Sequence, residues 1–380
     1  MDFNLNEERQ QLGDMLQRFV RKDYGFEARR KIVASAEGFS REVWRELANL
    51  GLTGVGISEE HGGTGGNAID TSIVMEALGT GLVVEPYLTT VVLCGALVRE
   101  AGTEAQRARI LPAIAGGELL VAFAQGEPGT RYELERVATT ARKDGAGYAI
   151  TGAKTLVLHG GSADRLIVSA RTSGEVAARR GISLFVVDAK ATGVKRRAYA
   201  TRDGQRAADI SFEKVAVGAD ALLGAEGDAF DAIERAVDTA IAALCAEAVG
   251  CMDALNAQTL EYLKTRKQFG VPIGSFQVLK HRMADMFIQA AQARSMAFLA
   301  AMRIAEAQGD ERRRAVAAAK ALVGRAARHV GQQAIQLHGG MGVTDELAVS
   351  HYFRRLTAIN ATFGDPEHHL ARFSDAMAID

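Results

Sequence analysis

The 380-residue chain has little cysteine, little proline and almost no net charge. Its three cysteines, Cys94, Cys245 and Cys251, lie in apolar runs, and this small, odd set fits neither a disulfide framework nor a zinc site. Lys and Arg total 45 against 46 Asp and Glu, whereas proteins that bind phosphate backbones usually carry a basic excess. We therefore expect a protein of the reducing cytoplasm, without a metal site and without a nucleic acid partner.

Long uninterrupted apolar runs are also missing. Residues 1–8 lack the basic and apolar succession of a secretory signal. The apolar stretch at 82–98 is interrupted by Glu85 and Pro86, and the stretch at 240–252 is too short to span a bilayer. We expect no transmembrane segment and no association with a membrane.

The composition that remains is that of an average soluble chain, with 48% hydrophobic and 24% charged residues, and its length suggests more than one structural unit. Residues 6–115 have the hydrophobic spacing of helices, whereas residues 119–223 contain short β-rich runs separated by turn residues. We predict an α+β fold with three parts: an N-terminal helical domain (1–118), a middle antiparallel β-barrel or sandwich domain (119–225) and a C-terminal four-helix bundle (226–380).

The C-terminal region is rich in alanine and predicts three long helices, at residues 230–265, 276–308 and 311–337. Few glycines and no prolines interrupt these segments. Helices of this length normally pack against one another as an antiparallel bundle.

Two glycine-containing segments follow these helices. The first is TRKQFG at 265–270, where an arginine at a helix C-terminus is by default a favourable partner of the helix dipole. The second is QLHGGMGV at 336–343, where a bare backbone would let a phosphate approach closely. A C-terminal glycine cap explains the second segment almost as well.

Together, and in this order, the two segments resemble the R-x-x-F-G turn and the Q-x-x-G-G loop of the acyl-CoA dehydrogenase flavoprotein family. The sequence EEHGG at 59–63 resembles the E-E-x-G-G turn of that family, and EPG at 127–129 resembles its E-P-G loop. The resemblance covers essentially the whole chain and implies the same order of helical, β and helical domains.

The resemblance implies an FAD that is bound between subunits, with its pyrophosphate held by an arginine and a glutamine loop of a neighbouring protomer. An arginine offers a permanent charge and a fork of donors for a diphosphate. Carried over residue by residue, the cofactor candidates are Arg266, Gln268, Phe269, Gln277, Gln336, Gly339 and Gly340. The loop that lines the flavin ring in the family corresponds to Gln125 and Gly126, and the next motif adds Leu158.

The chain departs from the common pattern of the family at two places. The usual catalytic glutamate precedes a glycine that matches Gly364, and this chain has Phe363 there, in a TFGD string similar to that of bacterial members such as the small subunit of pimeloyl-CoA dehydrogenase. The hydroxyl and aromatic residues beside the flavin are replaced by Gly126, Leu156 and Leu158. Backbone amides would have to bind the ring instead.

The base therefore has to come from elsewhere. Removing a proton next to a thioester needs a carboxylate in a dry site, where desolvation raises its pKa. Between 240 and 252 the only carboxylate is Glu247, and none of its helical neighbours at three and four residues can pair with it. We expect Glu247 to be the base; the alternatives are a solvent-facing position or a structural pair with an arginine of another helix.

The residues after Phe363 allow more than one interpretation. Asp365, followed by Pro366, is either a cofactor-side residue or the N-cap of a helix. The adjacent His368 and His369 diverge on a helix and make a poor pair of metal ligands. No G-x-G-x-x-G sequence or P-loop appears, so a nicotinamide cofactor has no local support.

The resemblance implies an FAD enzyme that oxidises an acyl-CoA thioester to its trans-2-enoyl form, in the β-oxidation of a fatty acid or dicarboxylate. Glu247 would remove the α proton, and the backbone N–H of Phe363 would bind the thioester oxygen. Electron-transfer flavoprotein would accept the electrons, and the chain would form a homotetramer or a heterotetramer with a second acyl-CoA dehydrogenase subunit. The alternatives are a non-catalytic or half-site subunit of a heteromeric enzyme and an oxygen-using flavoenzyme on the same fold.

Overall fold

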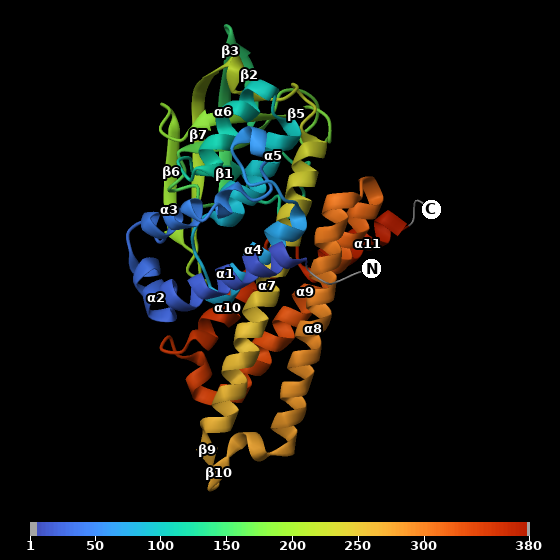
Figure 1. Ribbon diagram of the computed structural model, residues 1–380. Helices are drawn as coiled ribbons and strands as arrows, with labels where there is room; N and C mark the ends of the chain where they lie inside the picture. Colours follow the sequence, from blue (N-terminus) through green and yellow to red (C-terminus); the bar gives the residue numbers. More distant parts are fainter. Residues whose placement is uncertain (1–5, 378–380) are drawn as a thin grey trace. The chain divides into compact units, whose positions relative to one another are not determined.

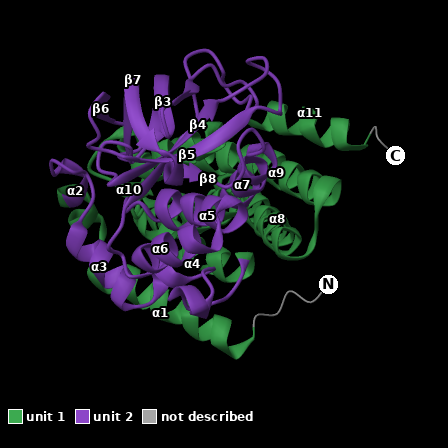
Figure 2. Ribbon diagram, turned by 90° about the horizontal axis from the view of Figure 1, so that it is seen from above, with its two compact units in different colours: residues 1–31, 68–83, 241–380 green, residues 32–67, 84–240 purple. Residues whose placement is uncertain are grey.

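The computed structural model of the chain describes residues 6–377, which form two compact units that interleave along the sequence (Figure 2). The helical unit contains residues up to 31 together with 68–83 and the chain from 241 onwards. The sheet unit contains residues 32–67 and 84–240. The N-terminal helical region thus contributes to both units, and the domain boundaries after residues 118 and 225 stay predictions.

The long C-terminal helices, drawn from yellow to red in Figure 1, confirm the helical periodicity of the sequence. Each of the three predicted helices begins and ends within two residues of its predicted bounds. The helices of this unit are α1 (Glu7–Asp23), α4 (Ala68–Gly81), α7 (Phe230–Thr265, from residue 241), α8 (Gln277–Glu306), α9 (Gly309–His338), α10 (Ala348–Ala361) and α11 (Pro366–Met377).

Small apolar side chains allow α8 and α9 to pack closely. The buried positions of α9 recur every three or four residues and include Val316, Ala319, Val323, Ala326 and Val330. This spacing places one apolar stripe along the helix, as amphipathic helices require. The buried positions of α8 are mainly alanines, at 290, 293, 297, 300 and 301.

Two glycines bring α4 and α7 into backbone contact. A Cβ atom at Gly250 would lie 1.9 Å from the carbonyl oxygen of Glu76, and one at Gly79 would lie 2.2 Å from the carbonyl oxygen of Glu247. Only a residue without a side chain fits at such distances. The glycines therefore fix the position of the α7 segment that carries Glu247.

The sheet unit combines short helices with one large sheet. Its helices are α3 (Arg41–Asn49), a π-helical turn at Tyr87–Cys94, α5 (Gly95–Ala101) and α6 (Glu104–Ala115), and α2 (Phe26–Ala34) continues into it. Its strands are β1 (Val121–Ala124), β2 (Thr140–Asp144), β3 (Gly147–Leu158), β4 (Arg165–Arg171), β5 (Ile182–Asp188), β6 (Val194–Ala200), β7 (Arg206–Gly218) and β8 (Leu222–Leu223).

The strand order of the sheet is β6-β7-β3-β2-β4-β5-β8, with β1 paired to β4. Most pairs are antiparallel, as the turn spacing predicted, but β1 and β2 each pair with β4 in parallel. The side chains of β4 are buried at six of its seven positions, and its valine and leucine join Phe185 and Phe212 in the core of the sheet unit. β4 is the strand around which this unit is built.

Within residues 6–377, helix α7 alone is long and apolar enough to cross a membrane by composition. Its most apolar window is 89% buried inside the protein, as the core helix of a globular fold would be. The three cysteines are free and buried, in agreement with the sequence prediction that they form no disulfide framework.

Candidate active site

The cofactor candidates at the end of α7 lie on a strained hairpin. Strands β9 (Lys267–Gln268) and β10 (Val271–Pro272) pair in antiparallel fashion, and Phe269 and Gly270 form the two-residue turn between them. Both turn residues have positive φ, 54° and 80°. A bulky residue rarely adopts this conformation, yet Phe269 does so while 92% exposed. Such strain at an exposed aromatic residue is typical of a position kept for binding.

The second cofactor segment begins where α9 ends. Gly339 has φ of 59° and ψ of −141°, a conformation that favours glycine, and the short helical turn Gly339–Val343 follows. A Cβ atom at Gly339 or Gly340 would meet no other atom within 4 Å. The backbone of this loop is therefore exposed to open space, as a phosphate-binding loop requires.

An aromatic stack brings the two segments together. The rings of Tyr262 in α7 and His338 in α9 stack with their centroids 4.4 Å apart, and the Tyr262 hydroxyl donates to the His338 carbonyl oxygen over 3.4 Å. Arg266 lies one turn beyond Tyr262, and Gly339 directly follows His338. The sequence motifs at the ends of α7 and α9 thus lie at the same end of the helix pair.

The groups at this end suit an anionic cofactor. In the described part of the chain no acceptor binds the Arg266 guanidinium, which is exposed. The side chains of Gln268, Gln277 and Gln336 are also exposed. An unpaired arginine beside an open glycine loop is the donor set that a diphosphate needs.

The TFGD turn after α10 is held from two sides. The Lys320 ammonium of α9 donates to the carbonyl oxygens of Ile359, Asn360 and Gly364 over 2.8, 3.1 and 2.9 Å. His369 of α11 donates from Nε2 to the Phe363 carbonyl oxygen over 2.9 Å. Sequence reasoning missed both roles: Lys320 acts on carbonyl groups 39 to 44 residues away, and His369 was considered only as a metal ligand.

This turn presents a free backbone donor. Phe363 has φ of 57°, and within residues 6–377 its N–H has no acceptor. Gly364 has φ of 115°, and a Cβ atom there would lie 2.6 Å from the His369 ring. The turn is therefore fixed with the Phe363 N–H available for a ligand.

Asp365 accepts from the His368 N–H over 2.9 Å, so it is the N-cap of α11. This is one of the two interpretations that the sequence allowed for Asp365.

Burial controls the charge of both anchoring residues. Desolvation lowers the pKa of Lys320 to about 8, although the nearby Cys245 and Asp365 oppose the shift. Desolvation and the neighbouring Lys320 charge lower the pKa of His369 to about 3. His369 is consequently neutral at physiological pH, and its buried Nδ1 has no partner in the structure.

Glu247 is buried, with 4% of its surface exposed, but it is not unpaired. The Arg355 guanidinium of α10 donates from Nε and Nη2 to its two carboxylate oxygens over 2.6 and 2.8 Å. This bidentate pair matches one of the alternatives to a catalytic role for Glu247, a structural pair with an arginine of another helix. The role of Glu247 as a base stays a prediction.

Sequence reasoning also missed two other carboxylates on α7. Glu234 is 5% exposed and Asp238 is completely buried, and both have interaction partners. Asp238 lies nine residues before Glu247, which places it on the opposite face of the helix because successive residues turn by about 100°. Its position as the single charged residue in the run AVDTAIAAL is the signal that would have identified it.

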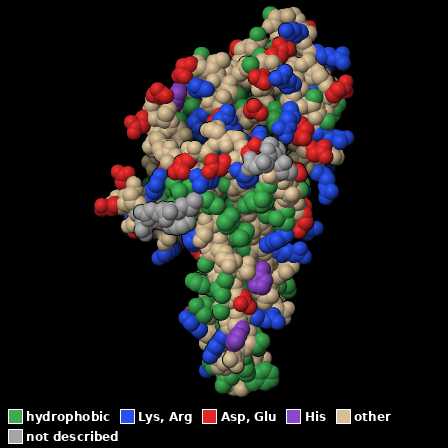
Figure 3. All heavy atoms as spheres, turned by 90° about the vertical axis from the view of Figure 1, so that its right-hand side faces the viewer, with side chains coloured by type: hydrophobic (Ala, Val, Ile, Leu, Met, Phe, Trp, Pro, Cys, Tyr) green, Lys and Arg blue, Asp and Glu red, His purple; other side chains and the backbone are tan. Residues whose placement is uncertain are grey.

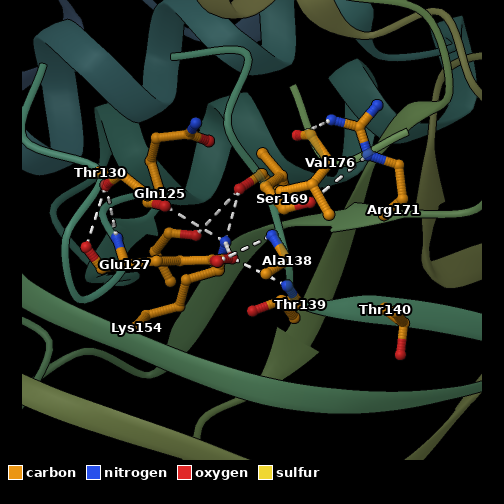
Figure 4. Close-up of polar contacts among 12 residues, drawn as sticks. Gln125, Glu127, Thr130, Ala138, Thr139, Thr140, Lys154, Ser169, Arg171 and Val176 are labelled. Atoms are coloured by element: carbon orange, nitrogen blue, oxygen red, sulfur yellow. Dashed lines mark hydrogen bonds and ion pairs between the residues drawn. The ribbon is translucent and has the colours of Figure 1, made fainter. Parts of the chain in front are cut away.

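The flavin-lining candidate Gln125 contacts a buried ion pair of the sheet unit (Figure 4). The Lys154 ammonium of β3 donates to Glu127 Oε1 over 2.8 Å and to Ser169 Oγ over 2.9 Å, and it reaches the Gln125 carbonyl oxygen at 3.2 Å. Glu127 also accepts from the N–H groups of Ala138 and Thr139 over 2.8 and 3.0 Å. The pair anchors the loop at 125–127 to the sheet.

The charges of this pair are shifted by burial and by each other. Desolvation lowers the pKa of Lys154 to about 8, and Glu127 only partly opposes it. Burial alone would raise the pKa of Glu127, but the Lys154 charge and the two backbone donors hold it below its usual value. Glu127 is therefore ionised at neutral pH.

Gln125 in this loop and Leu156 in β3 each have an unusual environment. Among residues 6–377 no donor reaches the buried Gln125 Oε1, while its amide nitrogen donates to the Leu134 carbonyl oxygen over 2.7 Å. Leu156 has φ of 51° and is 58% exposed, which is unusual for a large apolar side chain in a sheet. Leu158, at the end of β3, is half-buried.

The sequence is similar to those of known proteins. Three family models match the chain: the acyl-CoA dehydrogenase N-terminal domain at residues 6–118, the middle domain at 122–215 and the C-terminal domain at 227–378. The short-chain specific acyl-CoA dehydrogenase of Megasphaera elsdenii is 30% identical over 370 residues, which cover 93% of this chain and 94% of the relative.

Solved structures share the fold over the whole chain. Butyryl-CoA dehydrogenase from Megasphaera elsdenii superposes with a TM-score of 0.92 at 28% identity, covering all of both chains. A chain of the ChsE4-ChsE5 complex from Mycobacterium tuberculosis superposes with a TM-score of 0.90, also at 28% identity and with full coverage of both chains.

Proposed function

Since the chain belongs to the acyl-CoA dehydrogenase family of FAD-dependent oxidoreductases, we propose that it removes the α and β hydrogens of an acyl-CoA thioester to give the trans-2-enoyl-CoA. The observation that carries this proposal is the free N–H of Phe363 in a turn fixed by Lys320 and His369. A fixed donor aimed at a thioester oxygen stabilises the negative charge that develops there when the α proton leaves.

The residues that would hold FAD fall into two sets. Arg266 and the Gly339–Gly340 loop suit the pyrophosphate, with Gln268, Phe269, Gln277 and Gln336 around them. Gln125, Gly126 and Leu158 would line the ring, and their loop offers backbone groups and the unpartnered Gln125 Oε1. When bound, FAD supplies the acceptor for the β hydride. Asp365 is assigned to the α11 cap, and a cofactor role for it stays a prediction.

Glu247 is the proposed base for the α proton. Its side chain is buried, and the bidentate Arg355 contact holds both of its carboxylate oxygens in place. Because that contact occupies both oxygens, the transfer requires the Arg355 guanidinium to release one of them while substrate is bound. The free energy that this release costs would be offset by the stabilisation that the Phe363 N–H gives to the negative charge on the thioester oxygen.

The experiment is an anaerobic titration of the FAD-reconstituted protein with acyl-CoA thioesters of different chain length and terminal charge. If the chain without a second subunit loses the absorbance of oxidised flavin at about 450 nm, the result supports the proposal. A bound flavin that no acyl-CoA bleaches would overturn it. The series also tests whether the substrate is a fatty acyl or a dicarboxylic thioester.

A non-catalytic or half-site subunit of a heteromeric acyl-CoA dehydrogenase is the second candidate. The Arg355 contact favours it, because a bidentate arginine is what a purely structural glutamate would show. The structure from Mycobacterium tuberculosis is likewise described as a complex of two differently named chains, ChsE4 and ChsE5. A folded, colourless protein that retains no added FAD would favour this role.

The proposed assembly is a tetramer, as a homotetramer or with a second subunit. Figure 3 shows hydrophobic side chains gathered on one face of the protein. The exposed large hydrophobic residues of the helical unit include Val278, Phe287 and Ile288 of α8, which are 62%, 66% and 50% exposed. Apolar surface of this kind marks interaction sites. Electron-transfer flavoprotein as the electron acceptor and the cytoplasm as the compartment belong to the same proposal.

A further inference from the structure

Lys154 is a buried cation whose contacts extend beyond an ion pair. Its side chain is 0% exposed, and its ammonium contacts Glu127, Ser169 and the carbonyl oxygen of Gln125. Figure 4 shows these three contacts converging on one nitrogen from the loop and from β4. A lysine is costly to bury, so a role in structure or function has to offset that cost.

The contact with Gln125 acts on one particular peptide group. The Gln125 carbonyl and the Gly126 N–H are the two ends of the same amide. A cation at the oxygen draws electron density from the amide and makes its N–H a stronger donor, as in any chain of hydrogen bonds. Among residues 6–377 the structure gives the Gly126 N–H no acceptor.

The peptide group on the other side of Gly126 is held by the same strand. Thr155 in β3 donates its N–H to the Gly126 carbonyl oxygen over 2.8 Å, and Lys154 precedes Thr155 on the same strand. A Cβ atom at position 126 would lie 3.2 Å from the Thr155 carbonyl oxygen, so a side chain fits there only tightly. β3 therefore holds Gly126 through its carbonyl oxygen and places a positive charge at the Gln125 carbonyl oxygen.

The charges around the amide have opposite effects. Lys154 makes the environment more positive, and Arg171 of β4 adds a second cation that is near enough to lower the pKa of Lys154. The negative charge of Glu127 opposes the positive charges of Lys154 and Arg171. Arg171 donates to the carbonyl oxygens of Val176 and Ala178 over 2.7 Å and binds no carboxylate directly. Removing Lys154 or Glu127 breaks the same ion pair but changes the local charge in opposite directions.

We propose that Lys154 polarises the Gln125–Gly126 amide, so that the Gly126 N–H acts as a strengthened donor to the flavin and replaces the hydroxyl donor that this chain lacks. The proposal rests on the proposed function, in which this loop lines the ring. A donor of more positive character favours the reduced flavin, which carries more negative charge than the oxidised form. Lys154 is thus a positioning residue that raises the reduction potential of the flavin, and the negative charge of Glu127 opposes this effect.

The test compares Lys154→Met with Glu127→Gln in the full-length protein reconstituted with FAD. The readouts are the reduction potential of the bound flavin and the dissociation constant of FAD. Lys154→Met should lower the potential and weaken FAD binding roughly tenfold, the difference expected between a charge-assisted and a neutral hydrogen bond. Glu127→Gln should raise the potential. Lys195→Met, at an exposed lysine of β6, is the matched control and should leave both quantities unchanged.

The opposite signs separate polarisation from a structural role. If the ion pair only holds the loop in place, both variants lower FAD affinity and move the potential in the same direction, and the proposal fails. If Lys154→Met does not fold, Glu127→Gln decides alone, since a lowered or unchanged potential overturns the proposal. Wild-type protein that binds no FAD would instead refute the proposed function, which distinguishes the two failures.

Discussion

The pair of Glu247 and Arg355 is the contact on which the mechanism depends most. Its two hydrogen bonds measure 2.6 and 2.8 Å, and the side chains are 5% and 11% exposed. Removing one partner from a buried ion pair typically costs about 3–5 kcal/mol because the other charge stays in a dry site. We therefore expect Glu247→Gln and Arg355→Met each to lower the free energy of unfolding by about 3 kcal/mol or more.

The two variants should differ in their chemistry although they break the same contact. Glu247→Gln keeps the size of the side chain and removes the proton acceptor, so it should slow reduction of the flavin by acyl-CoA by roughly 10²–10⁴-fold, the usual contribution of a general base. Arg355→Met keeps the carboxylate and removes its ion-pair partner. Because the proton acceptor is still present, this variant should lose much less of its rate of flavin reduction than Glu247→Gln does.

The assay is anaerobic stopped-flow absorbance of the flavin, combined with denaturant unfolding of each variant. Wild-type reduction rates in Glu247→Gln would refute its role as base, whatever the stability data show. Equal stability losses with equal rates in both variants would identify the pair as structural. A loss below about 1 kcal/mol in both variants would refute the premise that the pair is buried and tight.

Three further predictions concern other parts of the helical unit. Arg266→Ala should release FAD without lowering the free energy of unfolding of the apoprotein, because its exposed guanidinium has no partner in the described chain. Flavin stoichiometry and calorimetry measure these two quantities. Full retention of flavin would contradict the assignment. Gly250→Ala should destabilise by several kcal/mol in denaturant unfolding, because its methyl group would lie 1.9 Å from the Glu76 carbonyl oxygen; an unchanged midpoint would contradict the close crossing of α4 and α7. The pKa of His369 is lowered from 6.5 to about 3, so the unfolded chain binds a proton below pH 6.5 that the folded chain does not, and stability should fall as the pH decreases below 6.5. His369→Gln keeps a donor for the Phe363 carbonyl and should flatten this dependence by up to about 1.4 kcal/mol per pH unit between about pH 5 and 6, and an unchanged slope would refute the buried neutral state.

The sequence was sufficient to predict the elements whose cause is local. The three long helices followed from alanine-rich segments without proline, and their ends agree with α7, α8 and α9. The turn spacing predicted the antiparallel part of the sheet but not the parallel pairing of β1 and β2 with β4, which depends on contacts between distant segments. The N-cap role of Asp365 was predictable because a cap acts within a few residues.

The contacts that define the site were not predictable, because each joins groups that are far apart in the sequence. Helical spacing excluded partners for Glu247 on α7 and could not reveal Arg355, which lies 108 residues away on α10. The same limit applies to Lys320, which holds the TFGD turn from 44 residues away at Gly364.

The backbone conformation of Phe363 explains why the proposed function needs these contacts. A bulky residue at φ of 57° is disfavoured, so Lys320, His369 and the cap at Asp365 must together hold the turn against that strain. A turn needed only to join α10 to α11 would be more stable with glycine or asparagine at this position. The N–H of Phe363 has no partner among residues 6–377, and strain around a free donor is typical of a position that binds a ligand. Under the proposed function, the replacement of the family's glutamate by phenylalanine removes a carboxylate but leaves the N–H that would polarise the thioester.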